Sequence, residues 1–290
     1  MNKFLKNISK FSLFCIISTI GLIISSLLFC NLRFDFTISK KKNVLILGNS
    51  HPECAINDTI LKNTFNLAQS GSGYFYDYIK LRSIVKKNKH IDTVVLGYSH
   101  RDLEQNMDTW FSEEIRIQNK MGKHFFLFDF QDYLKLLKSN PIAVLKNSPK
   151  SIYNNVIAPE KGYTNLGGYK RLDRNKLDIA KKNLKTKKKI VFNSEKSQYQ
   201  VFFLKKIYTL CIANNIKLIL LNTPMHPTFN NHNANLIKHY QTFAKEHLTE
   251  AKLIDHSALK IDENYFADLD HLNYNGANFY SQFLYKKGFR

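Results

Sequence analysis

The sequence predicts an α/β protein in which helices cover both faces of a parallel sheet, preceded by one N-terminal transmembrane helix. Three observations lead to this prediction. Short apolar runs typical of buried strands alternate with amphipathic stretches typical of helices. Polar motifs with catalytic residue types follow these runs, at the sheet edge where α/β proteins place their chemistry. A long uncharged apolar segment stands near the N-terminus.

Five short runs are expected to be the strands of the sheet. Each is largely apolar, as expected for strands buried on both faces. They are residues 43–48, 64–68, 91–97, 216–221 and 252–255. The predicted helices are residues 76–88, 199–214, 236–248 and 275–285. Strands that alternate with helices in this way predict a three-layer arrangement around a parallel sheet.

Residues from about 105 to 198 do not fit this alternation. They include Trp110 and the aromatic-rich run 124–128. A stretch of this length between core elements indicates an insertion with helices of its own. It could be a lid or substrate-binding cap, or it could have only a structural role. The predicted organisation is therefore a tail and membrane anchor over residues 1–35, then an α/β domain over residues 40–290 that carries the insertion.

The apolar N-terminal segment runs from Phe11 to Leu32, 22 residues without a charge. A helix of that length spans a bilayer core. The segment is longer than the apolar part of a signal peptide and has no Ala-x-Ala-like exit, so we expect an uncleaved signal anchor. Lys3, Lys6 and Lys10 precede it. Because short lysine-bearing tails stay inside, we expect a single-pass protein of the cytoplasmic membrane whose domain faces the extracytoplasmic side.

The composition gives no support for several other classes of function. The chain has 43 Lys and Arg against 23 Asp and Glu, a net charge of +20, but the basic residues are scattered and no nucleic-acid-binding motif accompanies them. We therefore expect no nucleic-acid partner. The four cysteines show no Cys-x-x-Cys pair and no zinc-ligand spacing. Neither a metal nor an organic cofactor is expected.

Three sequence elements carry the residue types of acyl-transfer chemistry. Ser50 follows Gly48 at the end of the first predicted strand, where a tight turn can expose a hydroxyl. Asp268 precedes His271 by three residues, and a carboxylate so placed can orient an imidazole that acts as a base. Small residues around Gly71, after the second strand, let backbone N–H groups approach a developing oxyanion. Each element alone also fits an ordinary turn or surface loop.

Taken together and in this order, the three elements resemble the SGNH (GDSL-like) hydrolase family over about residues 43–290, outside the insertion. Gly48-Asn49-Ser50 stands where that family has Gly-Asp-Ser, Gly71 (with Gly73 a close competitor) where it has its second-block glycine, and Asp268 with His271 where it has Asp-x-x-His. The resemblance implies a flavodoxin-like five-stranded sheet. It also implies that Ser50 is the nucleophile, His271 the base and Asp268 its orienting partner, with backbone N–H groups of Ser50 and Gly71 as oxyanion donors.

The third block departs from the family pattern. The family has Gly-x-Asn-Asp after its third strand, whereas this chain has Gly97-Tyr98-Ser99-His100. Ser99 would donate a hydroxyl in place of the Asn amide, or His100 would take over. Losing one oxyanion donor typically costs about 2.7–4 kcal/mol of transition-state stabilisation. Besides His100, we expect His51 and His226, after the first and fourth strands, as candidate substrate-binding residues.

The expected function is that of a serine esterase that removes acyl groups, acetyl first among them, from a cell-envelope glycan. The first alternative is an O-acyltransferase, or an accessory protein that works with a multi-spanning membrane acyltransferase. The same three side chains would serve both, because only the acceptor of the acyl group differs. The second alternative is a non-enzymatic glycan-binding module, which the missing Asn favours.

Overall fold

The computed structural model describes residues 2–157, 166–173, 176–186, 195–229 and 234–289. The chain divides into two compact units. The helical unit consists of Met1–Asp35 and Ser112–Gly162, and the α/β unit consists of Phe36–Phe111 and Tyr163–Arg290. Within the predicted insertion, residues 158–165, 174–175 and 187–194 lie outside the described residues.

A five-stranded sheet forms the centre of the α/β unit. Its strands are β1 (Val44–Leu47), β2 (Thr64–Asn66), β3 (Thr93–Gly97), β4 (Lys217–Asn222) and β5 (Lys252–Asp255). All neighbouring strands pair in parallel, in the order β2-β1-β3-β4-β5. This is the flavodoxin-like order, whose ligand crevice lies where the order reverses, between β1 and β3. The predicted fold class is confirmed, and the strand boundaries agree with the prediction within two residues.

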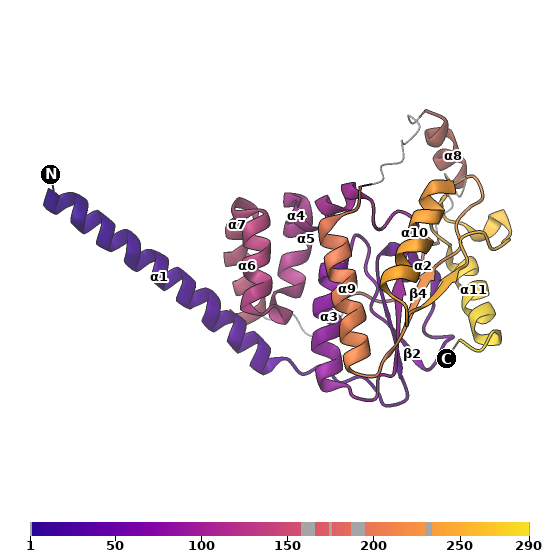
Figure 1. Ribbon diagram of the computed structural model, residues 1–290, viewed down its shortest axis with the longest axis horizontal. Coiled ribbons are helices and arrows are strands. Elements are labelled where there is room, and N and C mark those ends of the chain that lie inside the picture. Colours follow the sequence, from indigo (N-terminus) through magenta and orange to yellow (C-terminus); the bar gives the residue numbers. More distant parts are fainter. Residues whose placement is uncertain (1, 158–165, 174–175, 187–194, 230–233, 290) are drawn as a thin grey trace. The chain divides into compact units, whose positions relative to one another are not determined.

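Helices cover both faces of this sheet (Figure 1). The pair α3 (Tyr74–Lys87) and α9 (Gln198–Ala213) packs together on one face, and the pair α2 (Ser50–Ala55) and α11 (Tyr274–Lys286) packs together on the other. The remaining elements of the unit are η1 (Gln105–Asp108), α4 (Thr109–Ser112, whose last residue begins the helical unit), α8 (Leu177–Thr186), α10 (Ala234–His247) and η5 (Glu263–Tyr265). The chain therefore forms the three layers that strand–helix alternation predicts.

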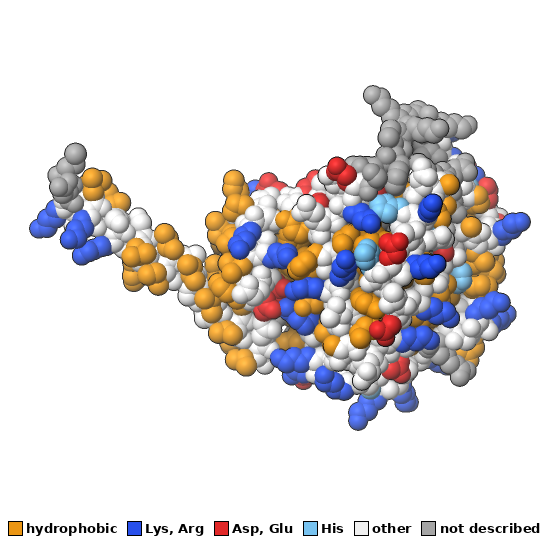
Figure 2. All heavy atoms as spheres, viewed as in Figure 1, with side chains coloured by type: hydrophobic (Ala, Val, Ile, Leu, Met, Phe, Trp, Pro, Cys, Tyr) orange, Lys and Arg blue, Asp and Glu red, His pale blue; other side chains and the backbone are white. Residues whose placement is uncertain are grey.

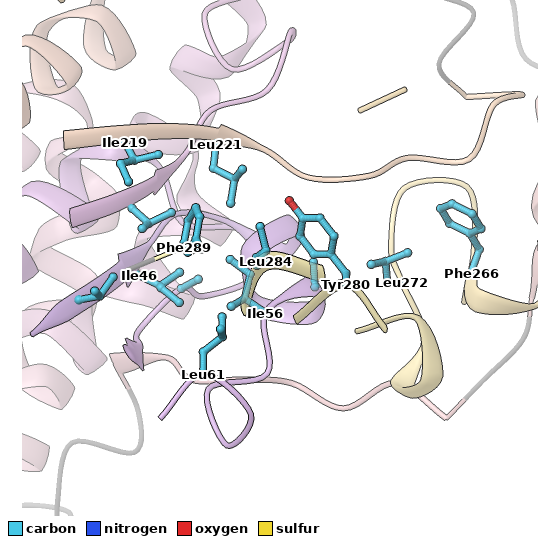
Figure 3. Packing of buried hydrophobic residues seen from close by; sticks show 14 of the residues in the cluster. Ile46, Ile56, Leu61, Ile219, Leu221, Phe266, Leu272, Tyr280, Leu284 and Phe289 are labelled. Atoms are coloured by element: carbon cyan, nitrogen blue, oxygen red, sulfur yellow. The ribbon is translucent and has the colours of Figure 1, made fainter. Parts of the chain in front are cut away.

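The core on the α2–α11 face explains why the strands read as continuous apolar runs. Val44, Ile46 and Val95 from the sheet pack with Ile56 and Tyr280 in one buried cluster (Figure 3). The intervening strand residues, which point to the opposite face, are equally buried. Because both faces are covered, neither set of alternating positions can be polar.

The helical unit contains α1 (Asn2–Arg33), α5 (Glu114–His124), η2 (Phe125–Leu127), α6 (Phe130–Ser139), α7 (Pro141–Ile152) and the π-helix η3 (Tyr153–Ile157). A capping box between Asp129 and Asp132 begins α6, and the Asn140 side chain caps α7, whose first residue is a proline. Both α6 and α7 thus begin at capping residues that stabilise the first turn of a helix.

The C-terminal third of α1 packs against η2 and η3 of the insertion. The Asn31 side chain donates a 2.8 Å hydrogen bond to the Phe128 carbonyl. By length and composition, α1 is able to cross a membrane. Figure 2 shows lysine side chains gathered toward its N-terminal end and apolar side chains along the part that follows. Part of the insertion is therefore packed against the N-terminal apolar helix.

Candidate active site

Ser50 is the first residue of α2, directly after β1. Asn49 caps this helix: its side-chain oxygen accepts a 3.0 Å hydrogen bond from the His51 N–H. Gly48 has a φ of +125°, and an added Cβ there would lie 2.9 Å from the Gly97 nitrogen. The glycine therefore permits both the turn and the close approach of β1 to β3, and it places the Ser50 hydroxyl, half-buried, at the carboxyl edge of the sheet.

His271 lies beside Ser50, although the two residues are 221 positions apart in the chain. Its Nε2 is 2.8 Å from the Ser50 Oγ, and its Nδ1 is 2.9 Å from Asp268 Oδ1. Asp268 Oδ1 also accepts from the backbone N–H groups of Asp270 and His271. The tight turn 268–271 thus fixes the carboxylate against the imidazole through contacts that do not involve Ser50.

A second carboxylate approaches the same imidazole nitrogen. Asp270 Oδ1 lies 3.3 Å from His271 Nδ1. Burial alone would lower the pKa of His271, but the hydrogen bonds and negative charges of Asp268 and Asp270 outweigh it and raise that pKa to about 9. Burial opposes ionisation of Asp270, yet His271 holds the pKa of that carboxyl well below its usual range. The imidazolium form of His271 is therefore strongly stabilised.

His51 lies at the side of this pair. Its ring meets the His271 ring edge-on, with 5.6 Å between centroids, and its Nε2 is 3.9 Å from Asp270 Oδ2. Burial, with the His271 charge adding to it, lowers the pKa of His51 to about 4. His51 is therefore neutral at pH 7. Ligand atoms of His51, Asp270 and His271 all lie within 4.8 Å of one another, so these three residues could hold a metal ion.

The loop after β2 is tied to the nucleophile strand. The Gln69 N–H donates to the Gly48 carbonyl at 2.9 Å, and the Ser70 hydroxyl donates to the Glu53 carboxylate of α2. Gly71 has a φ of +68° and sits within a turn closed by the Ser72 N–H and the Gln69 carbonyl. A left-handed residue at this point of a turn favours glycine. The loop that carries Gly71 is thus fixed to both β1 and α2.

Ser99 is held by Asp102 rather than left open. Its backbone N–H donates a 2.7 Å hydrogen bond to Asp102 Oδ2, and its side chain also hydrogen-bonds that carboxylate. Asp102 further accepts from Asn49 Nδ2 at 3.3 Å and from the Tyr74 hydroxyl at 3.3 Å. Burial raises the pKa of Asp102 to about 6 in spite of these hydrogen bonds. This buried network joins the third-block position to the residue that caps α2.

The other two candidate histidines are engaged within the fold. His100 is buried, with its Nε2 2.8 Å from Asp255 Oδ2 at the end of β5 and its ring edge-on to Tyr240. His226 Nε2 lies 3.2 Å from Glu263 Oε1. The His226 backbone N–H donates to the Leu269 carbonyl, so the histidine is joined to the loop that carries Asp268.

Two residues of this site were missed from the sequence. Asp270 adjoins His271 in the chain, but neighbouring residues in a loop give no signal of which side chains converge. Asp102 had a weak local signal, because a serine followed three residues later by an acid is typical of a cap or turn. That signal could have identified Asp102 as the partner of Ser99.

Comparisons with known proteins add little to this geometry. A protein-family model matches residues 169–288, and no curated protein matches the chain. Among solved structures, the chain is similar to a GDSL-like lipase from Bacteroides thetaiotaomicron, with 12% identity, a TM-score of 0.41 and coverage of 89% of this chain and 92% of that one. It is also similar to a Streptococcus pneumoniae protein named for platelet activating factor, with 8% identity, a TM-score of 0.42 and coverage of 98% of both chains. Both TM-scores are low, so function is proposed from the geometry of the site.

Proposed function

We propose that the protein is a serine esterase of the SGNH type. The observation that carries this proposal is the hydrogen-bonded series from Ser50 through His271 to Asp268, with distances of 2.8 and 2.9 Å. A serine hydroxyl becomes a nucleophile when an oriented base removes its proton, and these distances suit that transfer. The site also lies after β1 at the edge where flavodoxin-like sheets bind ligands.

In the proposed reaction the Ser50 Oγ attacks the acyl carbon while His271 Nε2 takes the hydroxyl proton. The tetrahedral intermediate collapses when the imidazolium returns that proton to the leaving alcohol, which gives an acyl-serine. Water, deprotonated by His271, then attacks the acyl-serine, and the acid is released when the bond to Ser50 Oγ breaks and the imidazolium returns its proton to that oxygen. Asp268 holds His271 with Nδ1 protonated, and backbone N–H groups of Ser50 and Gly71 would bind the oxyanion.

The proposed substrate is an acyl ester, acetyl first, of a cell-envelope glycan, with the catalytic domain on the extracytoplasmic side of the cytoplasmic membrane. The apolar helix α1 supports a membrane location, and its lysine-bearing tail supports this orientation. The same helix favours one second candidate. A serine held at a membrane could pass its acyl group to a sugar hydroxyl instead of water, together with a multi-spanning membrane acyltransferase.

Labelling with a fluorophosphonate probe tests the proposal. The full-length protein should be labelled at Ser50, and Ser50→Ala and His271→Ala should abolish labelling. Ser83→Ala, which alters a serine of α3, is the matched control and should be labelled like the wild type. Unchanged labelling of Ser50→Ala would exclude Ser50 as the nucleophile, and an unlabelled wild-type protein would favour the non-enzymatic glycan-binding module.

The acceptor can be identified with an acetyl ester and a glycan supplied together. Release of acetate that is unaffected by the glycan supports the esterase. Acetyl groups that appear on the glycan, and do so only when Ser50 is intact, would instead support the acyltransferase.

A further inference from the structure

Helix α7 and its π-helical extension η3 carry an exposed apolar stripe. Ile142 is 78% exposed, Leu145 51%, Tyr153 54% and Ile157 69%. Together with exposed Pro149, these residues recur every three or four positions, which places them along one side of a helix.

The opposite side of α7 is already used to fold the helical unit. Val144, Ser148 and Ile152 are buried there, and α7 packs against α5 and α6. The exposed stripe is therefore a second apolar face that the fold of this unit does not need. Single exposed apolar side chains are common on proteins, but a continuous stripe marks a contact surface.

Two lysines border the stripe. Lys146 follows Leu145, Lys150 follows Pro149, and both are exposed. Lys146 also forms a 2.7 Å ion pair with Glu114, which leaves Lys150 as the more available charge. An apolar helix face bordered by basic residues is typical of helices that lie at a membrane interface, where the lysines meet anionic headgroups.

The contact between η3 and α1 also places the stripe near a membrane surface. The face of α1 that the unit buries begins at Ile23. Lys10, the last basic residue before the apolar stretch, lies 13 residues earlier, which is about 20 Å along a helix. A hydrocarbon core is about 30 Å thick. If Lys10 stays at one surface, the part of the unit that contacts α1 reaches the level of the opposite leaflet.

We infer that the α7–η3 stripe docks on the bilayer, in the leaflet from which α1 leaves the membrane. The apolar side chains enter the boundary between headgroups and acyl chains, and Lys150 meets lipid phosphates. The helical part of the insertion then contacts both the C-terminal third of α1 and the membrane surface. This inference rests on the proposal that α1 spans a membrane, and it does not depend on the chemistry at Ser50.

Tryptophan quenching in vesicles tests the inference. The chain has one tryptophan, so Trp110→Phe gives a background without this fluorophore. In that background, Tyr153→Trp places a probe on the stripe with little change in shape. Full-length protein is reconstituted in phosphatidylcholine–phosphatidylglycerol vesicles, with and without bromine on the acyl chains. We expect brominated lipid to quench the Tyr153→Trp probe.

Two further single-tryptophan variants distinguish a failure of the stripe to dock from a failure of α1 to enter the membrane. Phe14→Trp reports whether α1 itself is in lipid, and Asn119→Trp reports an exposed position on α5, away from the stripe. Quenching of Phe14→Trp and Tyr153→Trp but not Asn119→Trp supports the inference. Quenching of Phe14→Trp alone overturns it, leaves the anchor intact and points to a protein partner for the stripe. Quenching of none of the three overturns the anchor as well. Equal quenching of Asn119→Trp and Tyr153→Trp also overturns the inference, because the stripe would not be the face that docks.

Discussion

Asp270 Oδ1 lies 3.3 Å from His271 Nδ1, the same nitrogen that Asp268 contacts at 2.9 Å. Two carboxylates therefore act on one imidazole, and together they raise its pKa to about 9 against the opposing effect of burial. At neutral pH most His271 side chains carry a proton and are unable to act as the base for Ser50. The second carboxylate thus sets the pH at which the proposed reaction runs.

Asp270→Asn should shift the pH dependence of ester hydrolysis to lower pH. With wild-type protein, kcat/KM should rise as pH increases and level off only near pH 9, because the base must be neutral in the free enzyme. Removing the charge of Asp270 lowers the pKa of His271, so the variant should be faster than wild type at pH 7. Initial rates with an acetyl ester between pH 5 and 10 measure this, and an unchanged midpoint would contradict it.

The same interaction should make the stability of the fold depend on pH. The pKa of His271 rises from an ordinary 6.5 to about 9 on folding. Its imidazolium therefore contributes stability that is fully present below pH 6.5 and is lost as pH rises through about 9. The difference in melting temperature between the wild type and His271→Gln should therefore become smaller as pH rises from 6.5 to above 9. A difference that stays constant from pH 6 to 10 would show that the ion pair does not stabilise the fold.

Asp268→Asn should reduce kcat strongly, whereas Asp270→Asn should not. Asp268 accepts hydrogen bonds from the Nδ1–H of His271 and from two backbone N–H groups. The asparagine side chain of the variant can still accept these bonds and so keep the turn, but it lacks the negative charge that orients His271. The equivalent change in a serine-protease triad lowers kcat about 10⁴-fold, and we expect a loss of similar order here. Asp270→Asn is the matched control because it neutralises a carboxylate at the same nitrogen. Equal losses in both variants would mean that neither acid has the specific orienting role.

Lys80→Met should destabilise the α/β unit. Lys80 is fully buried, and its Nζ lies 3.0 Å from Asp77 Oδ1 and donates a 2.7 Å hydrogen bond to the Leu67 carbonyl. Removing one partner of a buried ion pair costs about 3–5 kcal/mol, because the remaining charge is left unpaired. Urea unfolding in detergent should show this loss, with Lys86→Met, an exposed lysine of the same helix, as control. The double variant Lys80→Met, Asp77→Asn should recover part of the stability, and no recovery would argue against the ion pair as the cause.

Gly276→Ala should weaken both the fold and the site. An added Cβ at Gly276 would lie 2.1 Å from the Tyr265 carbonyl oxygen, so the loop that leads to Asp268 must move. Gly122→Ala is the matched control, because its Cβ would meet only the Ser151 hydroxyl at 3.8 Å within a helix. We expect Gly276→Ala to lower the melting temperature and the esterase rate. Gly122→Ala should leave the rate unchanged and stabilise its helix by about 0.5–1 kcal/mol. A Gly276→Ala protein as stable and active as wild type would contradict the predicted clash.

The sheet was readable from the sequence because all five strands are short apolar runs bounded by turns and separated by amphipathic helices. A strand buried on both faces must be largely apolar, so a short continuous apolar run in a sequence predicts such a strand. The order of the strands followed from a family resemblance, and the pairing of β1 with both β2 and β3 confirms it. The sequence of the insertion indicates only where its helices begin and end, so its packing against α1 was not predicted.

Local signals also led to the prediction of Ser50, Gly71, Asp268 and His271 as site residues, since each follows a strand or lies in a turn with a characteristic residue. The structure brings Ser50, His271 and Asp268 into hydrogen-bonding contact. It also shows that Ser99 bonds Asp102 and that His100 and His226 bond carboxylates of the fold. The role of Ser99 as an oxyanion donor and the roles of His100 and His226 in substrate binding stay predictions.

The sequence by itself determined the strands, the helices and the residue types that stand at the carboxyl edge of the sheet. These depend on burial and backbone conformation, which act over a few neighbouring residues. Only the tertiary structure decided that Asp270 joins Asp268 at His271, that Asp102 holds Ser99, and that the insertion packs on α1. Such contacts depend on the distances and directions between side chains from separate elements, and a linear pattern does not encode these until the elements are packed.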